Sequence, residues 1–579
     1  MLQRGPDAAG EWWSEDGRVG LAHRRLAILD LDARANQPMC SNDARYVIAF
    51  NGEIYNFREL RQELERDGAV FRTTSDTEVL LVFFVREGER MLHRLRGMFA
   101  IAIWDEQARE LFLARDPYGI KPLYYTQTKI GLIFASQVKA LLAIGLVSTQ
   151  TEPAGVAGFY LWGSVPEPWT LYRDIFALPA GHWMRVRAGV ADAPIRWSDI
   201  RNHWRGEGCE LPAAELQERV RQAMLDSARA HLIADVPVSV FLSGGIDSGA
   251  LAGLAAGFGA QVEGITIGFE EFAGQRDDEI PVARSLATHY NLSHHVRIVS
   301  RAEFEQDVPL ILNAMDQPSI DGVNTWFASK AAAERGYKVV LSGVGGDELF
   351  YGYPSFRQIP RAAALGRAIA AVPGSRTLLN SPCAWLAQRR SQPRLAGLPM
   401  FMDSIEGTYF LRRGLFLPGE LPALMGHDMA MEGLKGLGGS PLSMALAAAR
   451  DGAAAVGLLE STHYLRNQLL RDSDWASMGH SLELRTPLID AKLLENLGPY
   501  TSGFINGAGK RMLAISPEKP LPDSIINRPK TGFSIPMAKW LTDAADQQAW
   551  SGIPMLNALG TSWARRWAKV VVDSQLKCV

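Results

Sequence analysis

The chain of 579 residues is 47% hydrophobic and 21% charged, and its formal net charge is -3. This length exceeds what a single hydrophobic core organises, so two or more domains are expected. The composition is typical of a soluble globular protein. The charge balance provides no basic surface for nucleic acid or an anionic membrane.

Four cysteines are widely spaced along the chain: Cys40, Cys209, Cys383 and Cys578. No CxxC pair occurs, which excludes a sequence-visible zinc site or disulfide framework and is typical of a reducing compartment. The N-terminus has no signal-peptide pattern, and no apolar run is long enough to span a bilayer. We therefore expect a cytoplasmic protein without membrane or nucleic-acid partners.

Residues 1 to about 190 alternate short β-type runs with turn signals, which predicts a β-rich first domain. Four runs are expected as strands: Tyr46–Phe50, Phe99–Trp104, Leu111–Ala114 and Gly131–Phe134. One amphipathic pattern predicts a helix over Phe57–Arg66. The polar, Gly-containing stretch Ile200–Glu210 is expected within a linker over residues 196–212.

A second domain is expected over residues 213–579. It opens with a predicted helix that has an apolar stripe of Leu216, Val220, Ala223 and Met224. Strands are predicted over 236–242, 264–267 and 338–341, and a helix over 280–290. This alternation is typical of a parallel sheet covered by helices. Residues 355–460 are rich in Ala, Leu and Gly, and we expect helices there.

A Gly-rich loop, Ser243-Gly-Gly-Ile-Asp-Ser248, joins the first of these strands to a helix. Its glycines allow backbone N–H groups to approach a phosphate closely, and the helix N-terminus adds the positive end of its dipole. It is not a Walker A loop, because no Gly-Lys-Ser/Thr follows. The pattern resembles the pyrophosphate-binding loop of the ATP pyrophosphatase (PP-loop) enzymes. On this loop alone, an ordinary strand-turn-helix remains an alternative.

A second Gly-rich loop, Ser342-Gly-Val-Gly-Gly-Asp-Glu348, follows another predicted strand. Ligands of parallel α/β sheets bind at the carboxyl ends of the strands, so Asp247 and Asp347 are expected to face the same triphosphate. Two carboxylates together with phosphate oxygens suit octahedral Mg²⁺. Each aspartate alone is better explained as a helix cap or turn residue. The pair in matching loops favours metal binding.

Two segments near the C-terminus, residues 474–487 and 528–536, are dense in His, Glu, Arg and Lys among turn residues. A lysine there can stabilise the charge that builds on an α-phosphate and an acyl oxygen during adenylation. Lys530 is the candidate, although by itself it is better explained as an ordinary surface lysine.

Together these segments closely resemble the glutamine-hydrolysing asparagine synthetase family over nearly the whole chain. The resemblance implies that Asp247 and Asp347 hold Mg²⁺ and that Lys530 is the catalytic lysine. The residues it implies at the ATP are Leu242, Ser243, Gly244, Gly245, Asp247, Ser248, Ile267, Ser342 and Gly343. The implied reaction is attack of a carboxylate, preferably that of aspartate, on ATP. Ammonia then attacks the acyl-adenylate, and AMP and pyrophosphate are released.

Five segments of the first half resemble the glutaminase domain of the same family: Arg4–Asp7, His23–Leu26, Phe50–Asn56, Ser75–Glu78 and Arg115–Pro122. The resemblance implies an N-terminal-nucleophile (Ntn) hydrolase fold, a four-layer αββα sandwich. We expect it over residues 1–195, truncated by its first strand. With the PP-loop domain, this predicts a two-domain chain of α+β and α/β type.

The same resemblance assigns five residues to glutamine. Arg25 offers a planar fork for the α-carboxylate, and Asp76 offers a negative partner for the α-ammonium group. The Asn51 side chain and the Gly52 N–H group can form an oxyanion hole. Glu53 would help to fix the substrate. Taken alone, Asn51-Gly52 is better explained as a hairpin turn.

The family's nucleophile is a cysteine at the mature N-terminus, whose own α-amino group acts as the base. It precedes the Arg-Gly-Pro-Asp segment, which here begins at Arg4, so we expect this polypeptide not to hydrolyse glutamine and to use ammonia. Cys40 is not a substitute, because it has no free amine and is predicted in a turn. Either the start is misassigned to an internal Met, which we favour, or glutaminase activity has been lost.

Several departures from the family pattern concern the carboxylate that accepts nitrogen. Val344 occupies a position where asparagine-forming members often have an acid, and Gln317 replaces the glutamate of a common Asp-Glu-Pro pattern. A sugar acid or a lactam-forming substrate is therefore an alternative to aspartate. A second alternative is an inactive paralogue that binds glutamine or ATP and assembles with a partner. A homodimer is also compatible with the sequence.

Overall fold

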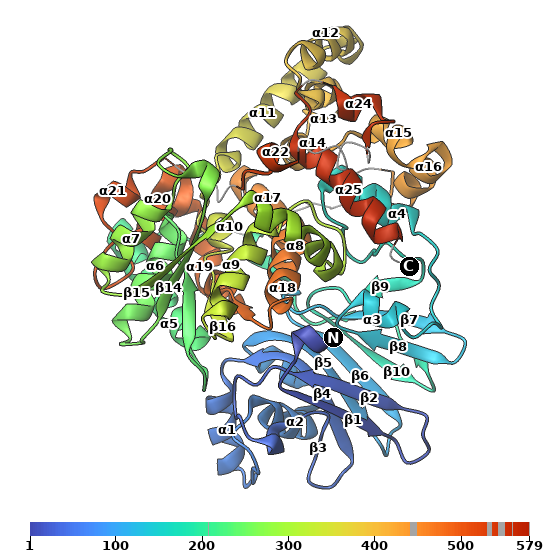
Figure 1. Ribbon diagram of the computed structural model, residues 1–579, viewed down its shortest axis with the longest axis vertical. Helices are drawn as coiled ribbons and strands as arrows, with labels where there is room; N and C mark the ends of the chain where they lie inside the picture. Colours follow the sequence, from blue (N-terminus) through green and yellow to red (C-terminus); the bar gives the residue numbers. More distant parts are fainter. Residues whose placement is uncertain (206–207, 440–448, 530–534, 542–549, 559, 578–579) are drawn as a thin grey trace.

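The computed structural model describes residues 1–579 except 206–207, 440–448, 530–534, 542–549, 559 and 578–579. Two halves stack along the long axis of the molecule, with the β-rich N-terminal half at the bottom of Figure 1. A parallel α/β sheet lies above it, and a cap of helices forms the top.

The first half is built on antiparallel sheets. The larger one has the order β11-β10-β6-β5-β4-β3, with β12 also pairing β10. Its strands are β3 (Met39–Cys40), β4 (Tyr46–Ile54), β5 (Gly97–Asp105), β6 (Glu110–Arg115), β10 (His182–Arg187), β11 (Val190–Ala191) and β12 (Ile195–Arg196). Two smaller sheets are formed by β1 (Ala8–Trp13) with β2 (Gly20–Arg25), and by β7 (Tyr124–Thr128) between β8 (Gly131–Ala135) and β9 (Ile175–Ala177).

Alternation along β5 explains the layers of this half. Ile101 and Ile103 pack into a core with α1 (Phe57–Arg66) and α2 (Asp76–Glu87), whereas Ala100 and Ala102 pack toward Leu21 of β2. The short helix α3 (Val138–Leu142) follows β8 and packs on the smaller sheet. The order helix, sheet, sheet, helix confirms the expected Ntn-type sandwich.

The predicted elements of this half are confirmed. The helix over Phe57–Arg66 has the expected bounds, and the four predicted strands lie inside β4, β5, β6 and β8. Cys40 lies on β3 rather than in a turn, because it pairs with Val47 of β4.

The second half contains a five-stranded parallel sheet of order β15-β14-β13-β16-β17. The strands are β13 (Val238–Phe241), β14 (Glu263–Phe269), β15 (Ser293–Val299), β16 (Val339–Leu341) and β17 (Glu483–Arg485). Successive strands are added on one side of β13 and then on the other, so the topological switch point lies between β13 and β16. This parallel sheet confirms the PP-loop type of α/β domain that the motifs predict.

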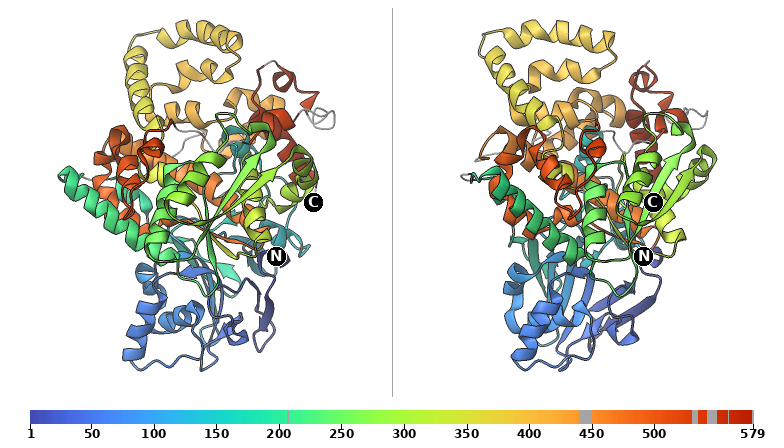
Figure 2. Two further views of the ribbon diagram at one scale, coloured as in Figure 1. Left: turned by 60° about the vertical axis from the view of Figure 1, so that its left-hand side comes forward. Right: turned by 90° about the vertical axis from the view of Figure 1, so that its left-hand side faces the viewer.

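Helices cover both faces of this sheet (Figures 1 and 2). α5 (Ala213–His231), α6 (Ile246–Gly257) and α7 (Ile280–His289) lie on one side, and α8 (Arg301–Ala314) and α9 (Val323–Glu334) lie on the other. The four apolar residues predicted on one face of α5 are all buried. The segment over 474–487 is not a solvated face, as expected: α18 (Arg471–Met478) and β17 occupy more than half of it, and its polar side chains Asp474, Glu483 and Arg485 are paired inside the protein.

The region over 355–460 is helical, as expected. It contains α11 (Ser355–Ala370), α12 (Ser375–Arg389), α13 (Leu398–Phe401), α14 (Ile405–Arg413), α15 (Leu421–Met425), α16 (His427–Gly436) and α17 (Gly452–Leu459). Residues Ile200–Trp204 before α5 are packed, since Trp204 is 1% exposed and lies over Gly457 of α17, whereas residues 208–210 are exposed. Within the described ranges, no helix is long and apolar enough to cross a membrane.

Buried ion pairs join the two halves. Arg4 pairs with Asp474 at 2.6 Å, and Lys121 pairs with Glu483 at 3.3 Å. Arg485, which is fully buried, pairs with Glu53 at 3.2 Å and donates from Nε to Glu483 at 2.8 Å. Charges are found inside proteins only where partners compensate their lost hydration, so these contacts fix how the halves meet.

We predict that Arg485→Met lowers the free energy of unfolding by about 3–5 kcal/mol, because it leaves the buried carboxylates of Glu53 and Glu483 without their cation. Chemical denaturation followed by circular dichroism measures this change. Arg18→Met, at a side chain that is 83% exposed, is the matched control and should be close to neutral. Equal stability of the two variants would contradict the prediction.

Candidate active site

The first Gly-rich loop connects β13 to α6. Ser243 and Ser248 close it, because the Ser243 N–H donates to Ser248 Oγ at 3.1 Å and the two hydroxyls lie 2.9 Å apart. The Gly245 N–H donates to Ser243 Oγ at 3.1 Å. The loop therefore places the N-terminus of α6, with the positive end of its dipole, at the carboxyl end of β13.

The second Gly-rich loop follows β16, which pairs in parallel with β13. The two loops touch: a Cβ on Gly343 would lie 2.9 Å from Asp247 Cβ and 3.0 Å from Ser248 N. Only glycine allows this close approach. Asp347 is in the first turn of the short helix α10 (Gly346–Leu349), so both aspartates stand at the switch point of the sheet.

A cavity of about 260 Å³ opens between the two loops. Most residues expected at ATP line it: Leu242, Ser243, Gly245, Asp247, Ser248, Ile267, Ser342 and Gly343, together with Asp347. Gly244 is outside this set and lies against Arg528, whose Nη1 would be 2.2 Å from a Cβ at that position. Arg528 Nη1 is buried and has no hydrogen-bond partner among the described residues. A phosphate on this loop would supply that partner.

Lys510, on α20 (Ala508–Ala514), lies between the two aspartates. Its Nζ forms a short ion pair with Asp247 and contacts Asp347 Oδ1 at 2.8 Å. Burial disfavours the ammonium ion, but the two carboxylates outweigh burial and raise the pKa of Lys510. Because both carboxylates reach one cation, their oxygens converge on one point.

The sequence pattern missed Lys510 as a site residue. It stands in a Gly-Ala-Gly-Lys-Arg stretch without a local signal, more than 160 residues after the second loop. Lys530, the lysine that the motif assigned, lies outside the described residues.

The five residues assigned to glutamine surround a second cavity, of about 440 Å³, between the sheets of the first half. Asn51, Gly52 and Glu53 lie on β4, Arg25 ends β2, and Asp76 begins α2. Gly52 has φ of 154°, and a Cβ there would lie 2.0 Å from the Met98 carbonyl oxygen. Cys40 does not line this cavity.

The motif predicts that the Arg25 guanidinium group is available to a ligand carboxylate, but in the structure it is hydrogen-bonded within the protein. Its Nη1 donates to Asp32 O at 3.0 Å and to Asn36 Oδ1 at 2.9 Å. Its Nη2 donates to Leu29 O at 3.0 Å and forms a short bond to Asp30 O. Arg25 thus organises the loop after β2, and a ligand carboxylate would have to displace one of these acceptors.

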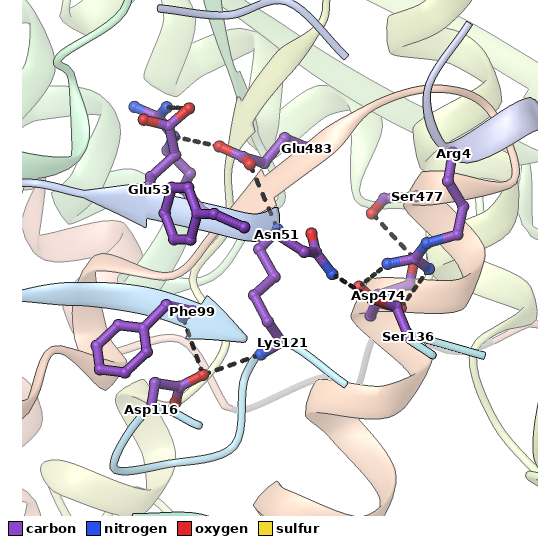
Figure 3. Close-up of polar contacts among 12 residues, drawn as sticks. Arg4, Asn51, Glu53, Phe99, Asp116, Lys121, Ser136, Asp474, Ser477 and Glu483 are labelled. Carbon is purple, nitrogen blue, oxygen red and sulfur yellow. Dashed lines mark hydrogen bonds and ion pairs between the residues drawn. The ribbon is translucent and has the colours of Figure 1, made fainter. Parts of the chain in front are cut away.

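Burial changes the pKa values of two carboxyl groups that line the cavity, those of Asp76 and Glu53. It raises the pKa of Asp76 to about 6, although the Ile54 N–H donates to Asp76 Oδ2 at 3.0 Å. It also raises the pKa of Glu53, despite the neighbouring Arg485. Asn51 Nδ2 donates to Ser136 Oγ at 3.2 Å, which fixes the amide near Glu53 (Figure 3).

The second half forms part of the wall of this cavity. Met478 of α18 and Glu483 of β17 line it together with Lys121. Figure 3 shows Lys121 bridging the Asp116 loop of the first half and Glu483. The carbonyl oxygen of Arg485, two residues after Glu483 on β17, accepts from the Ser342 N–H at 2.8 Å. The two cavities are therefore joined through three residues of β17.

We predict that Lys510→Met destabilises the protein at pH 7.5 by about 3 kcal/mol, because Asp247 and Asp347 then repel each other without a cation. Adding Asp247→Asn to this variant should restore part of the loss. Denaturant titration measures both. Lys492→Met, at a side chain 49% exposed, is the control. A double variant no more stable than Lys510→Met would contradict the prediction.

Two protein-family models match the chain. One, described as a glutamine amidotransferase domain, matches residues 1–197, and the other, described as asparagine synthase, matches residues 219–552. The second match alone covers more than half of the chain. The matched regions are centred on the two cavities.

Curated relatives extend over most of the sequence. Asparagine synthetase [glutamine-hydrolyzing] 1 of Bacillus subtilis is 30% identical over 94% of this chain and 84% of its own length. Asparagine synthetase [glutamine-hydrolyzing] 3 of the same organism is 28% identical over 92% of this chain and 82% of its own. Amidase chry2 of Gibberella zeae is 31% identical over 62% of this chain and 54% of its own. The chain belongs to the glutamine-hydrolysing asparagine synthetase family and is a glutamine-dependent carbon–nitrogen ligase.

Proposed function

We propose that the chain converts aspartate to asparagine through an acyl-adenylate, releasing AMP and pyrophosphate. The observation that supports this most strongly is the convergence of Asp247, Asp347 and Lys510 on one point between two glycine loops. ATP-dependent amidation is the activity of the family. The acceptor, the adenylate and the individual residue roles are the parts proposed here.

In this proposal the triphosphate lies on the first loop. The N–H groups at the start of α6 and the Arg528 guanidinium face its oxygens. Leu242 and Ile267, which are 1% and 3% exposed, provide apolar contacts for the nucleoside. Lys510 stabilises the negative charge that develops when the acceptor carboxylate attacks the α-phosphate.

Asp247 and Asp347 would hold Mg²⁺. Their oxygens already converge on the Lys510 ammonium group, which fits a cation at that point. No cluster of three or more His, Cys, Asp or Glu that could hold a metal occurs in the described part of the chain, so phosphate oxygens would complete the coordination. Bound Mg²⁺ would neutralise charge on the leaving pyrophosphate.

Glutamine is proposed to lie in the cavity of the first half. Asp76 faces its α-ammonium group, and the Asn51 amide and the Gly52 N–H stabilise an oxyanion. Lys121, Met478 and Glu483 form the wall toward the second half, which is the direction in which ammonia would have to move.

The cavity beside the nucleotide loops supports a second acceptor. Asp321, Asp472 and Glu348 line its far side, and none of the described lining residues carries a positively charged side chain. Burial, reinforced by Asp321, raises the pKa of Asp472 to about 8. Burial, reinforced by Asp347, raises that of Glu348 to about 7. The α-carboxylate of aspartate finds no cation in this wall, whereas a hydroxylated carboxylate such as a sugar acid finds hydrogen-bond acceptors.

Pyrophosphate release from Mg-ATP and ammonium chloride separates these acceptors. Aspartate-dependent release with formation of asparagine would establish the first proposal, and release only with sugar acids would replace it with the second. Asp247→Asn should lower the rate at least about a hundredfold, since it removes a charge at the phosphates. Asp277→Asn, on an exposed loop, should not. Unchanged release by Asp247→Asn would contradict both proposals.

We further predict that glutamine binding weakens as the pH falls through about 6, the pKa of Asp76. The raised pKa means that Asp76 is charged above this pH and neutral below it, where it no longer attracts the α-ammonium group. Affinity should fall roughly tenfold from pH 7 to pH 5, in proportion to the ionised fraction. Isothermal titration calorimetry measures it. Asp76→Asn should bind weakly at all pH values, and an unaltered pH profile in that variant would exclude the assignment.

A further inference from the structure

A third large cavity, here called the Arg466 cavity, lies between the two halves and has a volume of about 480 Å³. Its walls come from the segment Pro166–Trp169 of the first half, from Arg196–Arg201, and from η8 (Glu460–Leu470) of the second half. It shares no lining residue with the glutamine cavity or the nucleotide cavity. The activity proposed above does not use it.

One wall of the Arg466 cavity is a π-helix. Residues 460–470 adopt this form, which is rare in proteins and occurs frequently at functional sites. It presents four side chains with hydrogen-bonding groups to the cavity, those of Thr462, His463, Arg466 and Asn467. His463, Arg466 and Asn467 of this helix all line the cavity.

Arg466 carries a charge that the surrounding protein does not pair. Its Nε donates to Tyr118 O at 3.2 Å, but within the described ranges no group accepts from its Nη atoms. The two acids of the cavity are occupied: Asp199 by Arg201 at 2.7 Å, and Glu167 by Arg115 at 2.7 Å. Burial lowers the pKa of Arg466, which reflects its poor hydration. A bound anion would remove this cost.

The rest of the wall selects the kind of anion. The rings of Trp162 and His463 lie with centroids 4.1 Å apart and are tilted by 39°, and Trp169 also lines the cavity. Burial lowers the pKa of His463 to about 4 and also lowers that of His182, so both rings are neutral at pH 7. Arg196 and Arg201 share the carboxylate of Asp199, at 3.0 and 2.7 Å, whereas no carboxylate of the described residues forms an ion pair with Arg466. The two Nη atoms of Arg466 match the two oxygens of a ligand carboxylate.

We propose that the Arg466 cavity binds a small monocarboxylate with an aromatic or apolar body. Its carboxylate accepts from the Nη atoms of Arg466, and its body packs against Trp162 and Trp169. Inorganic phosphate is the competing ligand, since Arg196 and Arg201 also line the cavity and share one carboxylate, but it has no apolar body to pack against Trp162 and Trp169.

The Arg466 cavity is lined by a helix that also reaches the two other cavities. η8 continues into α18 without a break. On this continuous helix, Leu469, Asp472 and Ser473 line the nucleotide cavity, and Met478 lines the glutamine cavity. A ligand on Arg466 would therefore contact the same continuous helix that lines both other cavities.

Binding of 4-fluorobenzoate to the whole 579-residue chain, followed by ¹⁹F NMR, tests the proposal. We expect saturable binding that saturating Mg-ATP and glutamine do not displace. Arg466→Gln should weaken it at least tenfold, and Arg466→Lys less, because a lysine keeps the charge but loses the fork. Trp169→Ala should also weaken it without altering the charge. Arg18→Gln is the matched surface control.

Three results would overturn the proposal: no saturable binding, binding to Arg466→Gln and Trp169→Ala as tight as to the unaltered chain, or tighter binding of inorganic phosphate than of fluorobenzoate in competition. Displacement by Mg-ATP or glutamine would assign the probe to the substrate cavities and would also count against it. If Arg466→Gln does not fold, Trp169→Ala and Arg466→Lys decide the outcome.

Discussion

The arrangement of both substrate cavities depends on Arg485. Its side chain is 0% exposed and contacts Glu53 of the glutamine cavity, Glu483 beside it, and the His231 carbonyl oxygen at the end of α5. Its backbone oxygen holds Ser342, the first residue of the second nucleotide loop. One residue of β17 thus sets the position of β4 relative to β16. Because the buried guanidinium is stable only with these partners, the two halves cannot shift independently without exposing uncompensated charge.

A second constraint operates at the switch point of the parallel sheet. The loops after β13 and β16 approach so closely that glycine is required at Gly343, and this approach brings Asp247 and Asp347 toward each other. The two carboxylates repel each other, and the ammonium group of Lys510, which contacts both, offsets this repulsion. In the free protein, the carboxylates of Asp247 and Asp347 need a cation between them. This arrangement also suits a triphosphate with bound Mg²⁺, because the metal ion compensates the negative charge of both the carboxylates and the phosphates. In the proposed function, the metal ion replaces Lys510 between the two aspartates, and the Lys510 ammonium group can then contact the reacting carboxylate.

The sequence predicts the elements whose signals are local. The amphipathic pattern gives α1 with its observed bounds, and the glycines before α6 and α10 predict two loops that the parallel sheet brings together. Elements fixed by distant contacts are missed. β17 has only three residues, and its polar residues Glu483 and Arg485 are buried because Lys121 and Glu53 pair with them. Lys510 and the π-helix have no local signal, since both acquire their role from segments more than a hundred residues away. For Arg25, the motif identifies the residue, but it does not predict the contacts of the guanidinium group. The loop after β2 determines these contacts.

The central claim is that an acceptor carboxylate attacks the α-phosphate of ATP in the cavity between the two loops. Transfer of ¹⁸O tests this most directly. The acceptor that supports AMP formation is labelled in its carboxylate, and the products are separated and analysed by mass spectrometry. The acyl-adenylate mechanism predicts one ¹⁸O atom in AMP for each amide formed, because the acyl–oxygen bond of the adenylate breaks when ammonia attacks. Unlabelled AMP, or label found in inorganic phosphate with ADP, would contradict it.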